Sequence, residues 1–393
     1  MRVENCKLGT QCIQGGWDPK KGEARVLPIY QSTTFLYESS EQMGRLFDLE
    51  DEGFFYTRLQ NPTSDAVAAK IAALEGGVGA MLTASGQAAN FYAVFNICEA
   101  GDHFICSSNV YGGTFNLFGV TMKKLGIECT FVDPDDTEEN LAKAFRPNTK
   151  CVVAETIANP ALTILDIEKF ARLAHSHGVP LIIDNTFATP INCRPFEWGA
   201  DIVTHSSTKY LGGHNDTISG IVVIKDNEEL VNKVRVHIKS HGSQLSPMDS
   251  WLVLRGIKTL AIRMDKHSEN AYKVAHWLRT QEKVKKVYYV GFEDHRDYEI
   301  TKKQTTGFGG MISFSVDEFA TVKKILKNVD LVMFAESLGG TETLITYPTT
   351  QTHEDTPQEM KDALGIDDCF LRLSVGIENA DDIIADLDRA MNG

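Results

Sequence analysis

Short apolar runs alternate with amphipathic stretches along most of the chain. The apolar runs have the length of buried strands, and they predict strands over residues 103–107, 128–133, 151–155, 180–184, 201–204 and 219–224. Between them, apolar residues at helical spacing predict helices over residues 64–76, 85–100, 115–125 and 167–177. Apolar strands that alternate with helices are typical of a mostly parallel sheet covered on both faces, so the sequence predicts an α/β fold.

The last third of the chain has a different pattern. A helical pattern runs from about residue 247 to residue 279, and it is followed by strand candidates at 284–290, 310–316 and 370–375 and by helices at 319–327 and 381–391. The first 60 or so residues lack strong periodicity and contain Gly15-Gly16, Pro19 and Pro28. We therefore expect an extended N-terminal arm over residues 1–60, a large domain over 61–250 and a smaller α+β domain over 251–393.

Composition and charge narrow the class of protein. The chain has 393 residues, of which 42% are apolar and 23% are charged, and its net charge is −14. This charge argues against a nucleic-acid or anionic-membrane surface, and the sequence shows neither an apolar signal core nor an apolar run of about 20 residues. The eight cysteines lack metal-ligand spacing and indicate reduced thiols. We expect a soluble cytoplasmic protein that holds no metal.

One lysine follows a predicted buried strand in a segment rich in hydroxyl groups, Ser206-Ser207-Thr208-Lys209. Burial lowers the pKa of a lysine, and a neutral amine can form a Schiff base with an aldehyde. The hydroxyl groups are suited to binding a phosphate. A cofactor that carries both an aldehyde and a phosphate is pyridoxal 5′-phosphate (PLP), so the segment predicts a PLP site. The alternative is that Lys209 is an ordinary lysine in solvent.

Asp184 ends the predicted strand over residues 180–184. Ligands of open α/β sheets gather at the carboxyl ends of strands. A carboxylate there can pair with the protonated pyridine nitrogen of PLP and keep the ring an effective electron sink. The alternative is that Asp184 only caps the turn that follows.

Two further segments supply candidate PLP contacts. Ser85, Gly86 and Gln87 open a predicted helix, whose free N–H groups and dipole favour an anion such as a phosphate. Tyr111 stands beside two glycines, where its ring could stack on a planar cofactor and its hydroxyl could transfer protons. The alternatives are an ordinary serine N-cap and a half-buried tyrosine at the end of a strand.

These four segments, in this order, resemble the Cys/Met-metabolism (trans-sulfuration) family of PLP-dependent enzymes, which includes cystathionine synthases and lyases, methionine γ-lyase and O-acetylhomoserine sulfhydrylase. The resemblance covers roughly residues 8–390. Further motifs that carry it are Tyr56-Thr-Arg58-Leu-Gln-Asn61-Pro-Thr, Glu155-Thr-Ile-Ala-Asn159-Pro, Glu336-Ser337-Leu-Gly-Gly and Leu371-Arg372-Leu-Ser-Val-Gly-Ile-Glu. It implies PLP as cofactor and an aspartate-aminotransferase-like fold (fold type I).

The resemblance also implies roles for individual residues. Lys209 would hold PLP and act as the base, and Tyr111 would assist as a second acid or base. Arg372 would bind the substrate carboxylate, helped by Asn159 and Ser337. The alternative for Arg372, which stands between Leu371 and Leu373, is a structural ion pair.

Assembly follows from the same resemblance. In the family, the Tyr-x-Arg segment of one subunit reaches the cofactor phosphate of its neighbour, within a homotetramer built from two dimers. Tyr56 and Arg58 would therefore complete the site of the partner, and a guanidinium suits a phosphate because it donates two parallel hydrogen bonds. If Arg58 is instead a surface arginine beside a turn, the monomer would function alone.

The motifs resemble different members of the family where the substrate is concerned. The segments around Tyr56 and Tyr111 resemble O-acetylhomoserine sulfhydrylases, and Gly113 stands where methionine γ-lyases usually carry a cysteine. Glu336 resembles the cystathionine enzymes, where it can meet the distal ammonium group, but Phe55 stands where those enzymes usually have an acidic partner. We predict γ-replacement on O-acetyl-L-homoserine by a sulfur nucleophile, giving L-homocysteine.

Three alternatives remain open. The first is γ-elimination from L-methionine or L-cystathionine, giving 2-oxobutanoate, ammonia and a thiol, and the second is cystathionine γ-synthase activity. The third is a PLP-binding protein with a regulatory, non-catalytic role. The presence of Lys209, Tyr111 and Arg372 together argues against the third.

Overall fold

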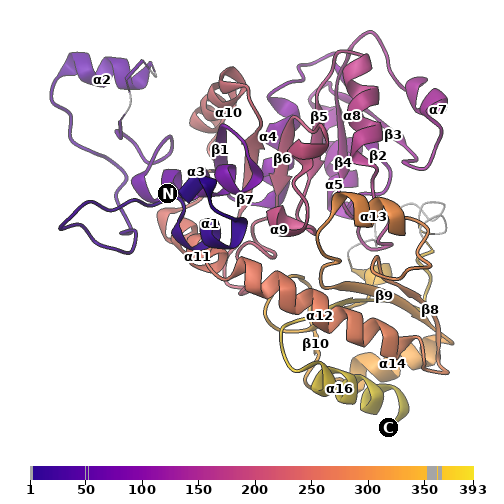
Figure 1. The fold of residues 1–393 in the computed structure, drawn as a ribbon. Coiled ribbons are helices and arrows are strands. Elements are labelled where there is room, and N and C mark those ends of the chain that lie inside the picture. The colour runs from indigo at the N-terminus through magenta and orange to yellow at the C-terminus, as the bar shows by residue number, and fades with distance from the viewer. Residues whose placement is uncertain (1–2, 49, 52, 352–360, 362–364) are drawn as a thin grey trace.

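A seven-stranded sheet forms the upper part of the computed structural model, which describes residues 3–48, 50–51, 53–351, 361 and 365–393 (Figure 1). Its order within these residues is β1-β7-β6-β5-β4-β2-β3. The strands are β1 (Gly79–Thr83), β2 (His103–Ser107), β3 (Glu128–Val132), β4 (Thr149–Glu155), β5 (Leu181–Asp184), β6 (Ile202–His205) and β7 (Gly220–Ile224). β7 runs antiparallel to both of its neighbours, and the other neighbouring pairs are parallel.

Both faces of this sheet are covered by helices. Side chains alternate between the two faces along a strand, so Ile183 and Val203 pack with α3 (Pro62–Glu75) and α8 (Ile167–Ser176), whereas Ile182 and Ile202 pack with α4 (Gly86–Phe95). The remaining helical segments of this part are α5 (Gly112–Asn116), a π-helical turn (Leu117–Thr121), α6 (Met122–Lys124), α7 (Glu138–Ala142), α9 (Thr189–Asn192), a 3-10 turn (Pro195–Trp198) and α10 (Glu228–His241).

A five-stranded sheet with the order β10-β11-β12-β9-β8 forms the lower part of the described chain (Figure 1). Its strands are β8 (Val284–Tyr288), β9 (Met311–Val316), β10 (Met333–Phe334), β11 (Leu344–Thr346) and β12 (Phe370–Ser374), and only the β10–β11 pair is parallel. Helices α12 (Leu260–Leu278), α14 (Phe319–Asn328) and α16 (Ala380–Asn392) bury the core of this sheet. The other helical segments are α11 (Pro247–Ile257), α13 (Tyr298–Gln304) and a 3-10 turn (Pro348–Thr350). β7 ends before residue 250 and β8 begins after it, so we keep the domain boundaries at residues 60 and 250 as a proposal.

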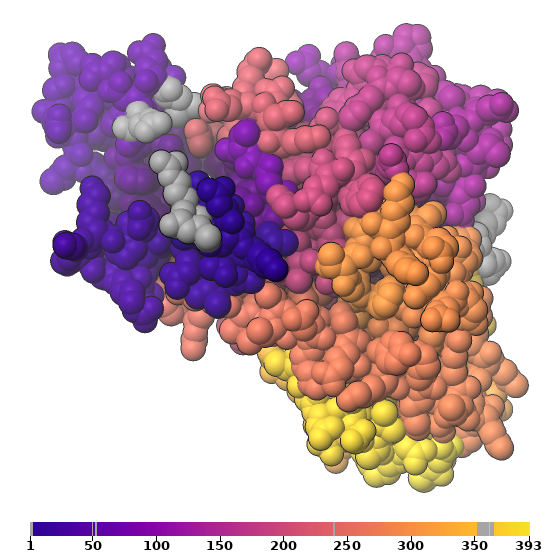
Figure 2. Space-filling view, viewed as in Figure 1, coloured from indigo at the N-terminus to yellow at the C-terminus, as the bar shows by residue number. Residues whose placement is uncertain are grey.

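The N-terminal segment is only partly the extended arm that the sequence predicts. After a 3-10 turn (Val3–Asn5), α1 (Leu8–Gln14) packs against α3 and α12 of its own chain and buries Cys12 completely. The chain then leaves the body, and α2 (Ser40–Phe47) lies at its far end (Figures 1 and 2). Leu36 in this segment is fully exposed. Periodicity missed α1 and α2 because each spans only about two turns.

The long helix predicted from residue 247 to residue 279 is broken into α11 and α12. The carbonyl oxygen of Gly256 accepts hydrogen bonds from the Thr259 hydroxyl group and from Arg263 Nη2, which turns the chain between the two helices. Gly256 also packs closely on the loop between β6 and β7 that carries Lys209 (the Lys209 loop), so an added Cβ would lie 2.0 Å from the carbonyl oxygen of Gly212. Tertiary contacts therefore override a continuous helical pattern here. Among the described helices, none combines the length and the apolar character needed to cross a bilayer.

Candidate active site

The loop between β6 and β7 places Lys209 at the carboxyl edge of the large sheet, facing the small sheet. Lys209 Nζ donates a hydrogen bond to Ser337 Oγ at 3.3 Å. Burial is the main cause that lowers the pKa of Lys209 to about 8, and the charge of Arg372 adds to it while Glu336 opposes it. A substantial fraction of this amine is therefore neutral near physiological pH.

Arg372, on β12, joins three of the predicted substrate-binding residues. It is 1% exposed. Its Nη1 donates to Asn159 Oδ1 at 3.0 Å, and its Nη2 donates to the carbonyl oxygen of Ser337 at 3.1 Å. Nη2 also lies 3.4 Å from Glu336 Oε1, and the Glu336 side chain is 45% exposed. The structural ion pair considered for Arg372 is thus present, but its acidic partner is an exposed side chain that a substrate carboxylate can replace.

Tyr111 directly precedes α5 and lies close enough to Glu336 and Arg372 for their charges to act on its hydroxyl group. Burial, and next the charge of Glu336, raise the pKa of the Tyr111 hydroxyl group, so this group stays protonated at neutral pH. Its ring lies on Gly113, where an added Cβ would come within 2.5 Å of the ring atom Cε1. A side chain at position 113 would therefore displace the Tyr111 ring.

Asp184 ends β5 as predicted, and three donors hold its carboxylate. Thr186 donates its backbone N–H (3.0 Å) and its hydroxyl group to Oδ1, and Asn90 Nδ2 donates to Oδ2 at 3.1 Å. The Thr204 hydroxyl group donates to Asn90 Oδ1 at 2.6 Å and so orients the Asn90 amide. Sequence reasoning missed Asn90, although its place one helical turn after Gly86 and Gln87 was a usable signal.

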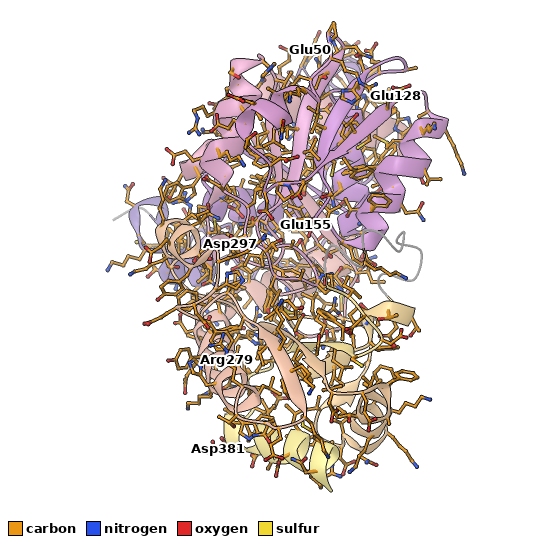
Figure 3. All side chains as sticks on the ribbon, turned by 90° about the vertical axis from the view of Figure 1, so that its right-hand side faces the viewer. Glu50, Glu128, Glu155, Arg279, Asp297 and Asp381 are labelled. Atoms are coloured by element: carbon orange, nitrogen blue, oxygen red, sulfur yellow. The ribbon has the colours of Figure 1, made fainter. Side chains whose placement is uncertain are left out.

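Glu155 is a buried carboxylate in register with Asp184 on the neighbouring strand. It lies near the centre of the molecule, between the two sheets (Figure 3). Its Oε1 accepts the backbone N–H of Tyr111 at 2.7 Å. Burial, and next the charge of Asp184, raise the pKa of Glu155 well above its usual value, although the N–H groups of Tyr111 and Asn159 oppose this. The sequence showed Glu155 within a motif but gave it no role.

The predicted phosphate contacts converge where α4 begins. Ser85 caps the helix by accepting the N–H of Ala88 at 3.1 Å, and an added Cβ on Gly86 would lie 2.5 Å from Ser206 Cβ. Only glycine therefore lets the start of α4 approach the Lys209 loop, and this leaves N–H groups of the first turn beside the Ser206 hydroxyl group. Gln87 Nε2 donates to Thr114 Oγ1 at 3.0 Å.

Two neighbouring hydroxyl groups differ from Ser206. Thr208 Oγ1 donates to the carbonyl oxygen of Ser219 at 3.1 Å and accepts the Ser219 N–H at 2.9 Å, so it already has partners within the chain. Ser207 Oγ is buried and has no hydrogen-bond partner among the described residues. The backbone N–H of Ser206 donates to Thr186 Oγ1 at 2.8 Å, which links this loop to Asp184.

Tyr56 and Arg58 do not join this cluster within one chain. The Arg58 guanidinium lies 5.5 Å from the centre of the Tyr56 ring, in the arm. Among the described residues, neither makes a hydrogen bond or an ion pair with the site residues. Phe55 is fully buried with Leu46 and Leu59 and faces the inside of the arm.

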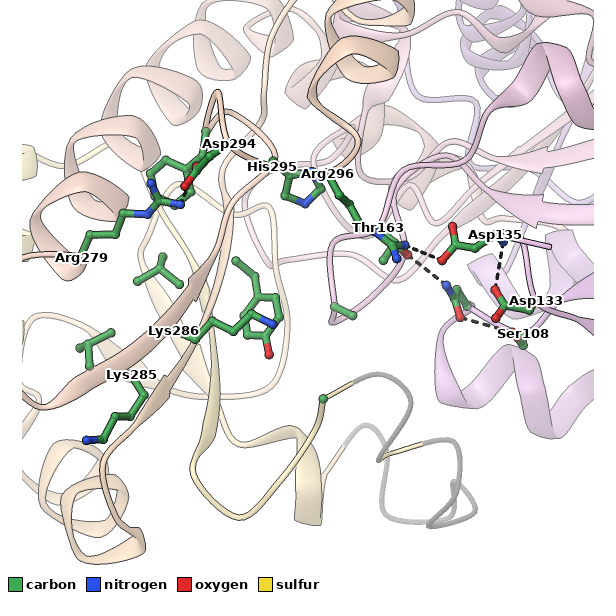
Figure 4. Close-up of a pocket in the computed structure, with 17 residues that line it drawn as sticks. Ser108, Asp133, Asp135, Thr163, Arg279, Lys285, Lys286, Asp294, His295 and Arg296 are labelled. Carbon is green, nitrogen blue, oxygen red and sulfur yellow. Dashed lines mark hydrogen bonds and ion pairs between the residues drawn. The ribbon is translucent and has the colours of Figure 1, made fainter. Parts of the chain in front are cut away.

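A cavity of about 790 Å³ lies beside the site, between the loops that follow β2 and β3 and the edge strand β8 (Figure 4). Its lining includes Asn109, Asp135, Lys286 and Arg296. None of the predicted site residues lines it. Among the described residues, no cluster of His, Cys, Asp or Glu side chains has the geometry to hold a metal ion.

Comparison with known proteins gives concordant matches over the whole chain. Residues 9–392 match the family model of Cys/Met metabolism PLP-dependent enzymes. The chain is 44% identical to an L-methionine γ-lyase of Fusobacterium nucleatum subsp. polymorphum (100% of this chain and 99% of the relative). It is 43% identical to a cystathionine β-lyase of Lactococcus lactis subsp. cremoris (98% of each) and to a cystathionine γ-lyase of Bacillus subtilis (98% and 99%).

A solved structure is also similar throughout. It is a putative O-acetylhomoserine (thiol)-lyase from Campylobacter jejuni, which carries N′-pyridoxyl-lysine-5′-monophosphate at its position 205. The TM-score is 0.96 at 33% sequence identity, and the alignment covers 99% of this chain and 100% of the other.

Proposed function

The chain belongs to the Cys/Met-metabolism family of PLP-dependent enzymes, and on this premise we propose that it is a γ-lyase. It would cleave the Cγ–S bond of L-methionine or L-cystathionine and, with one water molecule, release 2-oxobutanoate, ammonia and a thiol. Family membership confirms three predictions made from the sequence: an enzyme acting on sulfur amino acids, PLP as its cofactor, and the aspartate-aminotransferase-like fold (fold type I).

The observation that carries this proposal is the 44% identity to a methionine γ-lyase over the entire chain. The sequence alone placed γ-replacement on O-acetyl-L-homoserine first, and that interpretation has less support, because the similar (thiol)-lyase structure is 33% identical. The alternative of γ-elimination is therefore the better supported of the two. Two residues favour cystathionine over methionine as the substrate. Gly113 stands where methionine γ-lyases usually carry a cysteine, and Glu336 resembles the cystathionine enzymes.

The residues present fit PLP. Lys209 offers an amine with a lowered pKa, and Asp184 offers a carboxylate held by three donors for the pyridine nitrogen. The start of α4 and the Ser206 hydroxyl group meet through Gly86, where any larger residue would fill the space, and they would hold the phosphate together with Ser85 and Gln87.

Arg372, Asn159 and Ser337 would position the substrate. The Arg372 guanidinium already has two fixed contacts, and the substrate carboxylate would take the place of Glu336 on it. PLP, when bound, supplies an aldehyde that captures the substrate amine and a ring that withdraws electrons from the bonds at Cα. Because Lys209 hydrogen-bonds to Ser337, its amine would lie beside the substrate carboxylate on Arg372 and hence beside Cα.

Lys209 and Tyr111 would move the protons. The neutral amine of Lys209 would remove the Cα proton, give this proton up to the bound cofactor and, neutral again, take a proton from Cβ, which allows the Cγ–S bond to break. The Tyr111 hydroxyl group, which is protonated at neutral pH, would donate its proton to the departing sulfur. Glu155 accepts the backbone N–H of Tyr111, and this hydrogen bond would fix the position from which the Tyr111 side chain reaches the substrate.

We expect the PLP-free protein to capture PLP at a rate that rises with pH through a value of about 8, because only the neutral amine of Lys209 reacts and the fraction of neutral amine grows as pH passes the pKa. Stopped-flow absorbance measures this rate. Nα-acetyl-lysine, whose side-chain amine is free, is the control in solution. Its rate of reaction with PLP should rise through the ordinary lysine pKa of about 10.4. A protein profile centred near that value would contradict the assignment of Lys209.

Product analysis tests the proposed reaction. Purified, PLP-loaded enzyme is given L-methionine, L-cystathionine, or O-acetyl-L-homoserine with sulfide. We expect 2-oxobutanoate from the first two, with cysteine as the thiol from cystathionine. Pyruvate and homocysteine from cystathionine would mean β-elimination, the reaction named for the Lactococcus relative, and homocysteine from the third mixture alone would restore the sulfhydrylase interpretation.

Glu336 should influence the choice between the two γ-lyase substrates. Once the substrate carboxylate has taken its place on Arg372, the Glu336 carboxylate is free to attract the distal ammonium group of cystathionine, which methionine lacks. Because the side chain is 45% exposed, we expect Glu336→Gln to lower the ratio of kcat/KM for cystathionine to that for methionine by only about two- to fivefold. An unchanged ratio would assign Glu336 to Arg372 alone.

We further propose a homotetramer, a dimer of dimers, in which Tyr56 and Arg58 reach the PLP phosphate of the partner. Three features of the arm support this. It projects from the body (Figure 2), it carries exposed apolar side chains such as Leu36, Tyr37 and Phe54, and Arg58 contacts no site residue among the described residues of its own chain.

Mixed oligomers test the shared site. Arg58→Ala should weaken PLP retention, since the phosphate loses a charge-assisted, two-pronged contact. When an Arg58→Ala chain is refolded with a Lys209→Ala chain, one of the two sites in each mixed dimer combines an intact Lys209 with an intact Arg58. We expect activity to return in that mixture. Mixed oligomers that form and stay inactive would rule out contribution in trans.

A further inference from the structure

Two rows of polar side chains run across the ends of β4, β5 and β6. One row contributes to the site, and the other consists of the next residue along each chain segment. The first row, in register across three strands, consists of Glu155, Asp184 and Thr204. The residues that follow them are Thr156, Asn185 and His205. Side chains alternate along a strand, so this second row points to the α3 face of the sheet, and each of its members is at most 1% exposed.

One carboxylate from α3 binds this second row together. Glu75 is the last residue of α3, and its Oε1 accepts hydrogen bonds from Asn185 Nδ2 at 3.0 Å and from His205 Nε2 at 2.6 Å. The Thr156 hydroxyl group donates to Asn185 Oδ1 at 2.8 Å. Glu75 therefore connects the ends of β5 and β6 directly, and the end of β4 through Asn185.

This arrangement is costly as core packing. The side chains of Glu75 and His205 have no exposed surface, and neither Glu75 Oε2 nor His205 Nδ1 has a hydrogen-bond partner among the described residues. A buried charge must be paired, so in this setting Glu75 and His205 depend on each other as hydrogen-bond partners. Apolar side chains of similar volume are often at least as stabilising as a buried pair of this kind. Stability alone is thus a poor reason for it.

We infer that Glu75 and His205 are positioning residues for PLP. Asn185 directly follows Asp184, and His205 directly precedes Ser206 and the loop that carries Lys209. By holding Asn185 and His205 on one oxygen atom, Glu75 fixes the spacing between the carboxylate assigned to the pyridine nitrogen and the loop assigned to the amine and the phosphate. The inference rests on those proposed assignments, and it concerns how tightly PLP is held rather than which substrate reacts.

A matched pair of variants tests it. Glutamine in place of His205 can still reach Glu75 Oε1 with an N–H group, whereas asparagine, one carbon shorter, cannot. PLP affinity is measured by titrating the PLP-free protein and following the visible circular dichroism of the bound cofactor. Partners behind the direct ligands of a metal site contribute about 10- to 100-fold to affinity, and by analogy we expect His205→Asn to bind PLP at least about tenfold more weakly. His205→Gln should stay close to the wild type.

Two further variants separate positioning from stability. The double variant Glu75→Leu/His205→Phe replaces the pair by apolar side chains, and we expect it to fold but to bind PLP as weakly as His205→Asn. Asp386→Asn is the control, because the Asp386 carboxylate is buried in the small-sheet part and accepts the N–H groups of Asp330, Leu331 and Val332 at 2.9–3.0 Å. It should lower the unfolding temperature and leave PLP affinity unchanged.

Wild-type PLP affinity and an unchanged dichroism band in a folded variant that lacks the Glu75–His205 bond, whether His205→Asn or the double variant, would overturn the inference. PLP affinity is measured without any substrate. A failure of the γ-lyase proposal in product analysis therefore leaves this test unaffected, and a failure here leaves the product analysis unaffected.

Discussion

Replacing Lys209 by alanine is expected to lower turnover by at least ~10³-fold and to remove the visible absorbance of lysine-bound PLP. The variant loses the amine that captures PLP and the base that acts at Cα and Cβ, and a positioned base alone contributes about 10²- to 10⁴-fold. Absorbance of the purified protein and 2-oxobutanoate release measure the two effects. A small primary amine added to the buffer should restore part of the turnover.

Lys70 offers a matched control for this variant. It is also a buried lysine, at 1% exposure, and burial lowers its pKa to about 8 as well, but it lies on α3 away from the site. Its Nζ has no hydrogen-bond partner among the described residues, so Lys70→Met should fold and keep both absorbance and turnover. Undiminished turnover in Lys209→Ala, or equal losses in the two variants, would contradict the role of Lys209.

Replacing Arg372 by leucine is expected to have the second largest effect. Removing one partner of a buried, hydrogen-bonded charge pair costs about 2–5 kcal/mol, or roughly 30-fold to several thousand-fold in kcat/KM. Leucine suits the strand, because Leu371 and Leu373 flank the position and are buried. Arg372→Lys should restore little, since an ammonium group cannot reproduce the two-pronged contact.

A substrate analogue shows whether this loss concerns the carboxylate. The wild-type enzyme should strongly prefer methionine to 3-(methylthio)propylamine, which is methionine without its carboxylate, whereas Arg372→Leu should lose most of this preference. Arg279→Leu breaks an ion pair with Asp294 outside the site and should keep it. A preserved preference in Arg372→Leu would make Arg372 a structural residue.

The sequence alone predicted nine of the twelve described strands and the residues at their ends, because these signals are local, but it missed β1, β10 and β11. Asp184 and Lys209 each stand at or just beyond the end of an apolar run, and the structure brings both to the same edge of the sheet. The partners of these residues were harder to predict. Asn90 and Asp184 are 94 positions apart, and Glu75 and His205 are 130 positions apart. No short pattern marks such a pair, since each half is an ordinary residue until the fold joins them.

The same limit explains the errors in the fold. The break between α11 and α12 depends on the contact of Gly256 with the Lys209 loop, which lies more than 40 positions earlier in the chain. The arm is a different case. Its own pattern is weak because several of its apolar residues face outward, as Leu36 does, and the surface that would cover them belongs to another chain in the proposed tetramer.

The site is divided between the two sheets, with Lys209 at the edge of one and Arg372 on the other. In the proposed reaction this division makes the pKa of Lys209 depend on whether a substrate is bound to Arg372. Arg372, which binds the substrate carboxylate in the proposed reaction, is also the charge that helps to lower the pKa of Lys209. A substrate carboxylate on Arg372 would add to the negative charge that Glu336 already supplies and would raise the proton affinity of the amine nearby. Before substrate binds, a substantial fraction of the amine is thus neutral and able to capture PLP, and in the proposed reaction substrate anchoring would make the same amine a stronger base when a proton must be removed.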